Sequence, residues 1–218
     1  MESITNSYDV VELFEQKIAQ YAGSKYAVAV DCCSNALFLC LMYIDRQPET
    51  VTIPKRTYVS VPSAILHAGY NLQFEDLKWS GVYQLKPFPI FDGAVRFRKG
   101  MYEGGLHCLS FHVKKHLKIG RGGMILTDDK QAADWFKLAR FNGRNPIHHD
   151  HDTFKMVGWN FYMPNYDAAR GLWLFDSMGD FYPDIVGGYP DLSIYNFIHN
   201  KSGGKLIKNE RTNSSSQD

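Results

Sequence analysis

The stretch that decides the fold runs from residue 89 to residue 129 and reads PIFDGAVRFRKGMYEGGLHCLSFHVKKHLKIGRGGMILTDD. It contains two short apolar runs that are each followed by charged side chains. Pro89 to Phe91 leads into Asp92, and Leu106 to Phe111 leads toward Lys114 and Lys115. Continuous apolar runs of this length are typical of strands that are buried on both faces of a sheet.

An acid at the end of one buried strand and a lysine just beyond another can together hold pyridoxal phosphate. The lysine amine forms a Schiff base with the aldehyde of the cofactor. The carboxylate keeps the pyridine nitrogen protonated, so that the ring can accept electrons. The pattern therefore predicts that Asp92 and one of the two lysines act on this cofactor.

The same stretch carries three motifs of a known family. Residues 110–117, SFHVKKHL, resemble the SFHxxKNL signature of the DegT/DnrJ/EryC1 sugar aminotransferases, with Lys115 at the position of the Schiff-base lysine. Asp92-Gly93-Ala94 is similar to the family's DAA segment, and residues 120–123, GRGG, are similar to its GEGG turn. The resemblance implies that Lys115 and Asp92 are catalytic and that Ser110 binds the cofactor phosphate.

A second resemblance lies nearer the amino terminus. Residues 26–41, YAVAVDCCSNALFLCL, resemble YAVAVSSGTAALHLAL, whose Gly-Thr pair binds the cofactor phosphate; Cys33 and Ser34 occupy those two positions. A strand that enters a helix through a short polar turn leaves unpaired N–H groups at the helix start, here around Asn35, and these can bind phosphate. The alternative is a helix cap without a ligand.

Two further positions take a role from the resemblance. Tyr58 lies in a segment similar to TFVATANAI, which places an aromatic ring against the cofactor face; the alternative is a core tyrosine. Residues 158–163, GWNFYM, resemble GYNYRM, whose asparagine crosses a dimer interface to the neighbouring cofactor phosphate. The resemblance therefore implies a homodimer in which Asn160 completes the partner's site.

The sequence also departs from the family. Only LKWSGVYQLKPF separates Asp76 from Pro89, which is too short for a strand and a crossover helix, so we expect a missing helix and a strand remnant at 82–85. Val95 replaces a glutamine or histidine that contacts the ring hydroxyl, and Arg121 replaces the acid of GEGG. The resemblance ends near Met178, before the carboxy-terminal domain of the relatives.

The expected fold is an α/β three-layer sandwich with a mostly parallel sheet, a reduced large domain of the fold-type I pyridoxal phosphate enzymes. Residues 1–200 are expected to form this domain, and the polar residues 201–218 a disordered tail. The aromatic-rich residues 179–200 can either cover the cofactor as a lid or pack against the chain's own sheet. We expect the second.

Composition excludes several classes of protein. A net charge of +1 over 218 residues gives no electrostatic reason to expect a nucleic acid or a membrane partner. The longest apolar run, residues 36–44, falls short of the roughly 20 residues that span a bilayer. The amino terminus does not resemble a signal peptide. Four cysteines without a metal-type spacing indicate reduced packing residues of a cytoplasmic protein.

One segment is rich in potential metal ligands. Residues 148–152 read HHDHD, and imidazoles and carboxylates suit zinc or iron. Neighbours in sequence rarely converge on one ion without a helical or hairpin spacing, so we interpret the segment as a solvated loop and expect no metal.

The resemblance implies an enzyme that transfers an amino group, usually from glutamate, to the keto carbon of a nucleotide-linked sugar. A branch of the family that dehydrates sugars replaces the lysine with histidine, and Lys115 argues against that chemistry. The alternative is a shortened, non-catalytic relative that binds cofactor or a partner as a regulatory or structural subunit. Cys33, Val95 and Arg121 favour this alternative. The residues that oppose it are Asp92, Ser110, Lys115 and Asn160.

Overall fold

The computed structural model describes residues 6–44, 47–147, 151–198 and 205–208. Its helices are α1 (Asp9–Ala22), α2 (Cys33–Tyr43), α3 (Ser60–His67), α4 (Lys130–Ala139), α5 (Asn165–Phe175) and the short 3₁₀ helix η2 (Leu192–Ile194). Its strands are β1 (Tyr26–Val30), β2 (Thr50–Pro54), β3 (Asn71–Glu75), β4 (Tyr83–Gln84), β5 (Ile90–Asp92), β6 (Leu106–Ser110), β7 (Gly123–Thr127), β8 (Tyr195–Ile198) and β9 (Lys205–Lys208).

The central sheet has the strand order β1-β7-β6-β5-β4 and is mixed. β7 runs antiparallel to β1 and β6, β6 and β5 are parallel, and β4 runs antiparallel to β5. The parallel pair β2 and β3 joins this sheet because Thr52 and Lys86 exchange backbone hydrogen bonds of 2.9 and 3.0 Å. The predicted α/β class is confirmed. The central sheet is mixed because β7 and β4 run opposite to β1, β5 and β6.

The direction of β4 follows from the short connection between β3 and β5. Residues 77–89 contain no helix, and the chain returns from β4 into β5 through residues 85–89. A hairpin needs only a few residues, whereas a parallel crossover needs about a dozen or more. The predicted loss of a helix is therefore confirmed, and the strand remnant predicted at 82–85 is β4.

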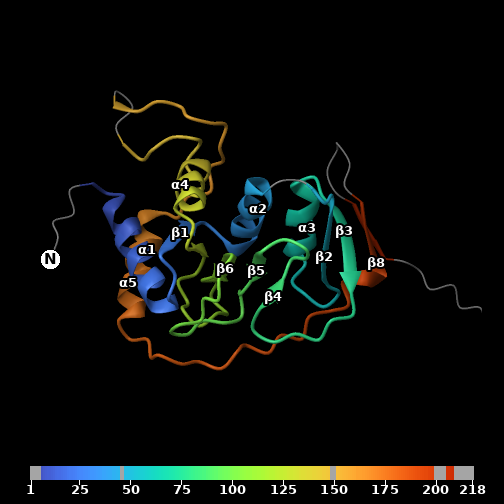
Figure 1. Ribbon diagram of the computed structural model, residues 1–218. Helices are drawn as coiled ribbons and strands as arrows, with labels where there is room; N and C mark the ends of the chain where they lie inside the picture. Colours follow the sequence, from blue (N-terminus) through green and yellow to red (C-terminus); the bar gives the residue numbers. More distant parts are fainter. Residues whose placement is uncertain (1–5, 45–46, 148–150, 199–204, 209–218) are drawn as a thin grey trace, which may run out of the picture.

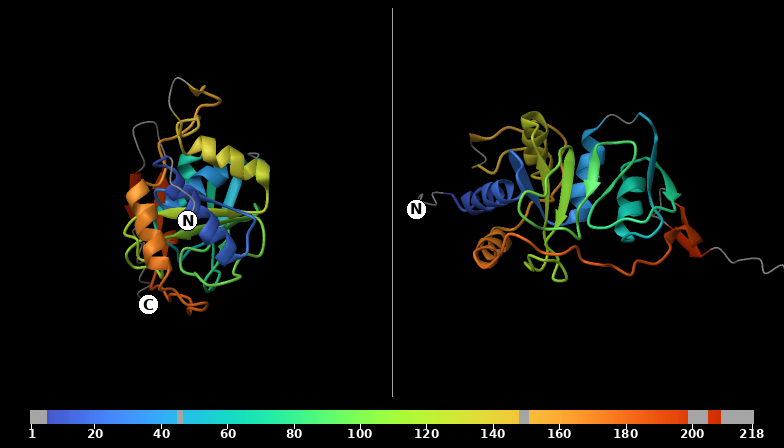
Figure 2. Two further views of the ribbon diagram at one scale, coloured as in Figure 1. Left: turned by 90° about the vertical axis from the view of Figure 1, so that its left-hand side faces the viewer. Right: turned by 60° about the horizontal axis from the view of Figure 1, so that its bottom comes forward.

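Side chains alternate along the central strands and form a core on each face of the sheet. In β1, Val28 and Val30 pack into the core that includes α2, α3 and α4. Ala27 and Ala29 pack into the opposite core with α1 and α5, which lie side by side in Figures 1 and 2. This alternation produces the predicted three-layer sandwich.

A buried ion pair closes the outer edge of β1. Glu15 of α1 and Arg140, just after α4, pair with each other. The Glu15 carboxylate accepts a hydrogen bond from the Ala29 N–H at 2.8 Å, and Arg140 donates to the Ala29 carbonyl. The edge of β1 is thus covered at Ala29 by charged side chains that satisfy the N–H and carbonyl of this residue and join α1, β1 and α4.

The segment Gly179–Leu192, called the crossing segment below, runs from α5 across the molecule toward β8 (Figure 1, lower side, orange to red). Beyond it, Phe197 packs against Phe74 of β3, as expected of residues that cover the chain's own sheet. β9, which lies within the residues 201–218 expected to form a tail, pairs antiparallel with β8. Residues 201–204 and 209–218 lie outside the described part.

The structure also bears on the cysteines, on membrane-spanning helices and on metal ligands. Each of the four cysteines is free, and the buried sulfur atoms of Cys40 and Cys108 lie 3.6 Å apart. Within the described residues, no helix is both long enough and apolar enough to cross a membrane, and no cluster of metal ligands occurs. Residues 148–150 of the histidine-rich segment lie outside the described residues.

His107 of β6 is a buried histidine whose Nε2 has no hydrogen-bond partner among the described residues. Burial, with a smaller contribution from Arg96, lowers its pKa to about 4. The folded state therefore holds the neutral imidazole, while the unfolded chain takes up a proton near pH 6.5. The contribution of His107 to stability is complete above pH 6.5 and is lost as the pH falls toward 4.

We predict that His107→Leu removes about 2 kcal/mol of the stability difference between pH 7 and pH 4.5. Urea unfolding of both proteins at these two pH values measures this difference. An equal loss of stability on acidification in the two proteins would contradict the prediction.

Candidate active site

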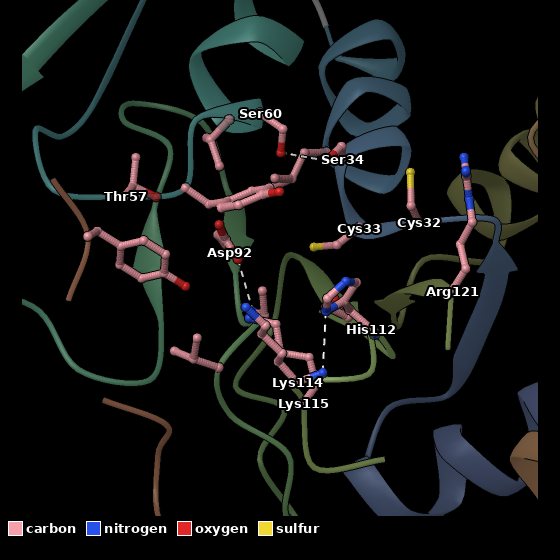
Figure 3. Close-up of a pocket in the computed structure, with 18 of the residues that line it drawn as sticks. Cys32, Cys33, Ser34, Thr57, Ser60, Asp92, His112, Lys114, Lys115 and Arg121 are labelled. Carbon is pink, nitrogen blue, oxygen red and sulfur yellow. Dashed lines mark hydrogen bonds between the residues drawn. The ribbon is translucent and has the colours of Figure 1, made fainter. Parts of the chain in front are cut away.

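A pocket of about 640 Å³ lies where β1, β2, β5 and β6 end. Ligands of open α/β sheets bind at the carboxyl ends of such strands, where loops replace the sheet. Figure 3 shows Asp92, Cys33 and Lys115 around the pocket, with Ser34 and Ser60 on one side and Arg121 on another. The principal polar lining residues are Ser34, Thr57, Tyr58, Ser60, Asp92, Ser110, His112, Lys114, Lys115 and Arg121.

The turn between β1 and α2 forms one wall. Cys32 has extended backbone geometry and makes no side-chain cap, so α2 begins at Cys33 with its first N–H groups uncapped by a side chain. A Cβ at Gly123 of β7 would lie 2.5 Å from the Cys33 nitrogen, so only glycine allows β7 to pass this turn. The Ser34 hydroxyl lies 2.6 Å from the Ser60 hydroxyl of α3. Two hydroxyls and a helix start therefore converge in a geometry suited to phosphate.

Asp92 stands at the end of β5 and is 6% exposed. Its carboxylate accepts hydrogen bonds from the Tyr83 hydroxyl at 2.7 Å and from the Ala94 N–H at 2.9 Å. Thr57 lies 2.6 Å from the Tyr83 hydroxyl and extends the network. Burial raises the pKa of Asp92, and the two hydrogen bonds and Lys115 act in the opposite direction. A cationic group that enters the pocket would further stabilise the carboxylate.

Lys115 lies on the loop that follows β6. Buried Phe111 and Leu117 hold the two ends of this loop in the core, and the Lys115 N–H donates to the His112 carbonyl at 2.8 Å. Lys115 is half-buried, whereas Lys114 is exposed. Burial lowers the pKa of Lys115, and Asp92 opposes this shift. A lowered pKa increases the fraction of neutral, nucleophilic amine, as covalent chemistry with an aldehyde requires.

Residues at or beside the positions that differ from the family motifs contact neighbouring side chains. Arg121 forms a 2.8 Å ion pair with Asp31, at the end of β1. A Cβ at position 93 would lie 2.2 Å from Nε2 of His107, so the ring of His107 takes the space of the alanine in the DAA segment. Cys33 is buried in the pocket wall; burial and nearby Asp92 raise its pKa well above the ordinary range.

The structure brings together most of the residues predicted from the sequence. Those that line this pocket are Cys33, Ser34, Tyr58, Asp92, Ser110 and Lys115. Asn35 instead donates its side-chain amide to Asp31 at 2.7 Å and lines a neighbouring groove. Asn160 is exposed and lines a third groove that it shares with Arg121. The roles of all eight residues in cofactor binding stay predictions.

Sequence reasoning missed several residues of the site. Tyr83 carries no motif, and it meets Asp92 only because these two residues are paired across β4 and β5. Ser60 is the first residue of α3 and lies two positions after Tyr58. A helix start near Tyr58 was the only feature of the sequence that could have indicated this residue. Trp79 and Tyr189 come from segments with no counterpart in the motifs and line the pocket side by side.

The donor set fits pyridoxal phosphate. A half-buried amine can hold the aldehyde, a buried carboxylate can pair with the ring nitrogen, and the Ser34–Ser60 corner can hold the phosphate. The fold and the site together define an aminotransferase-type α/β domain with its pocket at the strand ends.

The chain belongs to the DegT/DnrJ/EryC1/StrS aminotransferase family, whose sequence profile matches residues 1–87 and 98–181. Asp92 falls between the two matched segments, so its assignment depends on the motif and on its place in the pocket.

Similar proteins include the spore coat polysaccharide biosynthesis protein SpsC of Bacillus subtilis, at 26% identity over 76% of this chain and 50% of the relative. GDP-perosamine synthase of Caulobacter vibrioides is 28% identical over 73% of this chain and 54% of its own length. The chain thus spans about half the length of these relatives.

Two solved structures share the fold. AtS13 from Actinomadura melliaura superposes with a TM-score of 0.66 at 20% identity, covering 78% of this chain and 60% of the other. PseC of Helicobacter pylori, an aminotransferase of pseudoaminic acid biosynthesis, gives 0.65 at 16% identity, with 77% and 57% covered.

We predict that Tyr83→Phe lowers the free energy of unfolding by about 1–3 kcal/mol, because a buried carboxylate loses one of its hydrogen bonds. Urea unfolding at pH 7 measures this change. Tyr166→Phe is the control, since Tyr166 is 74% exposed. Equal stability of the two variants would show that the Tyr83 hydroxyl does not support Asp92.

Proposed function

We propose that this protein is a pyridoxal phosphate-dependent aminotransferase that acts on a nucleotide-linked keto-sugar. One observation carries the proposal: a half-buried lysine and a buried carboxylate share one pocket with a phosphate-type corner. Membership of the aminotransferase family supports it. Nucleotide-linked sugars enter the proposal through relatives such as GDP-perosamine synthase. Glutamate as amino donor follows from the resemblance in sequence.

The bound cofactor would supply an aldehyde that accepts an amino group and a ring that takes up the electron pair left by a departing proton. Lys115 would hold the cofactor and then move a proton between the substrate carbon and the cofactor carbon, acting as general base and general acid. Asp92 would pair with the protonated ring nitrogen. Ser34 and Ser110 would bind the phosphate, and Tyr58 would cover one face of the ring.

A homodimer is part of this proposal. Asn160 is exposed on a groove with Asp31 and Arg121, at the side of the main pocket, where a second chain can approach. A residue supplied by a partner makes cofactor binding and association reinforce each other. We expect sedimentation to show a dimer that tightens with cofactor and is weakened by Asn160→Ala. A monomer that is saturated with cofactor would rule out the shared site.

The first test of the function concerns the attachment of the cofactor. We expect borohydride reduction of protein loaded with pyridoxal phosphate to attach the cofactor to Lys115, as mass spectrometry of peptides can show. Lys115→Ala abolishes the labelling, whereas exposed Lys114→Ala, the matched control, retains it. Labelling of Lys114 in the unsubstituted protein would contradict the assignment.

The second test concerns the first half of the reaction. Glutamate added to the loaded protein should convert bound pyridoxal phosphate to pyridoxamine phosphate and yield 2-oxoglutarate, both measurable by chromatography. Asp92→Asn should slow this conversion by at least about 100-fold, because the ring nitrogen loses its charged partner. If Lys115 is labelled but no amino donor and no amino-sugar changes the cofactor, the alternative of a cofactor-binding, non-catalytic subunit is correct.

A further inference from the structure

The crossing segment is fastened along the side of the pocket at several points. The Lys99 N–H donates to the Asp180 carbonyl, and the Ile185 N–H donates to the Val95 carbonyl, both at 2.9 Å. At the far end, the Leu192 N–H donates to the Lys55 carbonyl at 2.8 Å. These backbone bonds join the segment to the loop after β5 and to the loop after β2, the two loops that border the site.

An ion pair holds the middle of the segment. Asp184 accepts two hydrogen bonds from Arg96, of 2.8 and 2.6 Å, and a third from Ser80 at 3.1 Å. The side chains of Asp184 and Arg96 are 13% and 18% exposed, so solvent screens this bidentate pair little. Lys99 and Asp180 form a second pair that is 62% and 73% exposed and contributes far less.

Tyr189 is the residue of the crossing segment that enters the pocket. Its ring stacks on Trp79 with a centroid distance of 6.0 Å and an interplanar angle of 19°. The Trp79 indole donates its N–H to the Arg56 carbonyl at 2.9 Å and packs on Tyr83, the partner of Asp92, with centroids 4.6 Å apart. Burial raises the pKa of Tyr189, and Asp92 contributes to the shift. The two rings therefore form one aromatic wall close to the proposed reacting centre.

We propose that Trp79 and Tyr189 form the subsite for the sugar ring of the substrate. This inference rests on the proposed function. The faces of aromatic rings are apolar and carry partial negative charge, and they pack well against the C–H face of a pyranose. The carbon that receives the amino group belongs to the sugar, so the sugar must lie beside Lys115 and Asp92. The nucleotide must extend outward from this point, which assigns the inner aromatic wall to the sugar and not to the base.

The Tyr189 hydroxyl adds polarity to this wall. Tyr189 is half-buried and lines the pocket. A hydroxyl so placed can bond to a sugar hydroxyl. We therefore expect Tyr189→Phe to keep the stacking contact and to lose only this bond.

Equilibrium binding tests the subsite without catalysis. The affinities of cofactor-loaded protein for UDP-N-acetylglucosamine and GDP-mannose are compared with those for UDP and GDP by calorimetry. We expect at least one sugar nucleotide to bind more tightly than its nucleotide, and Tyr189→Ala to reduce that preference about tenfold or more. Phe181→Ala is the control, because Phe181 lies on the same segment and is 68% exposed, and this variant keeps the preference for the sugar nucleotide.

Arg96→Met tests whether the segment positions the wall. It removes the bidentate partner of Asp184, leaving, among the described residues, only Ser80 at 3.1 Å and Arg98 at 4.0 Å. It should lower the sugar preference as Tyr189→Ala does, while Lys99→Met leaves the preference unchanged. Assays are run below the melting temperature of each variant.

The inference is wrong if no sugar nucleotide binds more tightly than its nucleotide, or if Tyr189→Ala preserves the preference. It is also wrong if Tyr189→Ala weakens the nucleotides as much as the sugar nucleotides, since the wall would then bind the base. Full preference in Arg96→Met would overturn the role of the crossing segment. Failure of the proposed function is detected by a different experiment, the conversion of the cofactor by glutamate, because that reaction needs no sugar.

Discussion

A carboxylate buried at the end of β5 is the constraint on which the site depends. Asp92 is nearly inaccessible to water, and a buried charge without partners is strongly unfavourable. The hydroxyl of Tyr83 and the N–H of Ala94 meet this need. Because Tyr83 is paired with Asp92 across β4 and β5, the reversed strand is part of the site and not only a shortened connection.

The close approach of chain segments gives the pocket its other walls. β7 can pass the turn before α2 only because Gly123 has no side chain, and this contact places the start of α2 at the pocket. Two serines from α2 and α3 then meet at hydrogen-bond distance. The loop after β6 brings Lys115 to the facing side, anchored by buried Phe111 and Leu117. Each group therefore depends on a different strand end, which is why open α/β sheets concentrate chemistry there.

The positions that depart from the family pattern form contacts of their own. The ring of His107 fills the space beside Gly93, and Arg121 pairs with Asp31 across the turn after β1. The crossing segment binds the backbone of Val95 and supplies Tyr189 to the wall near it. These substitutions alter the surroundings of the pocket, while Lys115, Asp92 and the Ser34–Ser60 pair line one cavity.

Much of the fold and half of the site could be predicted from residues that are close in sequence. The apolar runs and the length of the connection at 77–88 predicted the α/β layers and the missing helix. The resemblance of short motifs to the family, such as SFHVKKHL, implied the places of Asp92, Ser34 and Lys115. The pairing of Tyr83 with Asp92, the meeting of Ser34 with Ser60, and the stacking of Tyr189 on Trp79 join residues 9 to 110 positions apart. Only the tertiary structure decided these contacts, because strand direction, register and the path of the crossing segment result from packing of the whole chain and leave no period or motif in any one stretch.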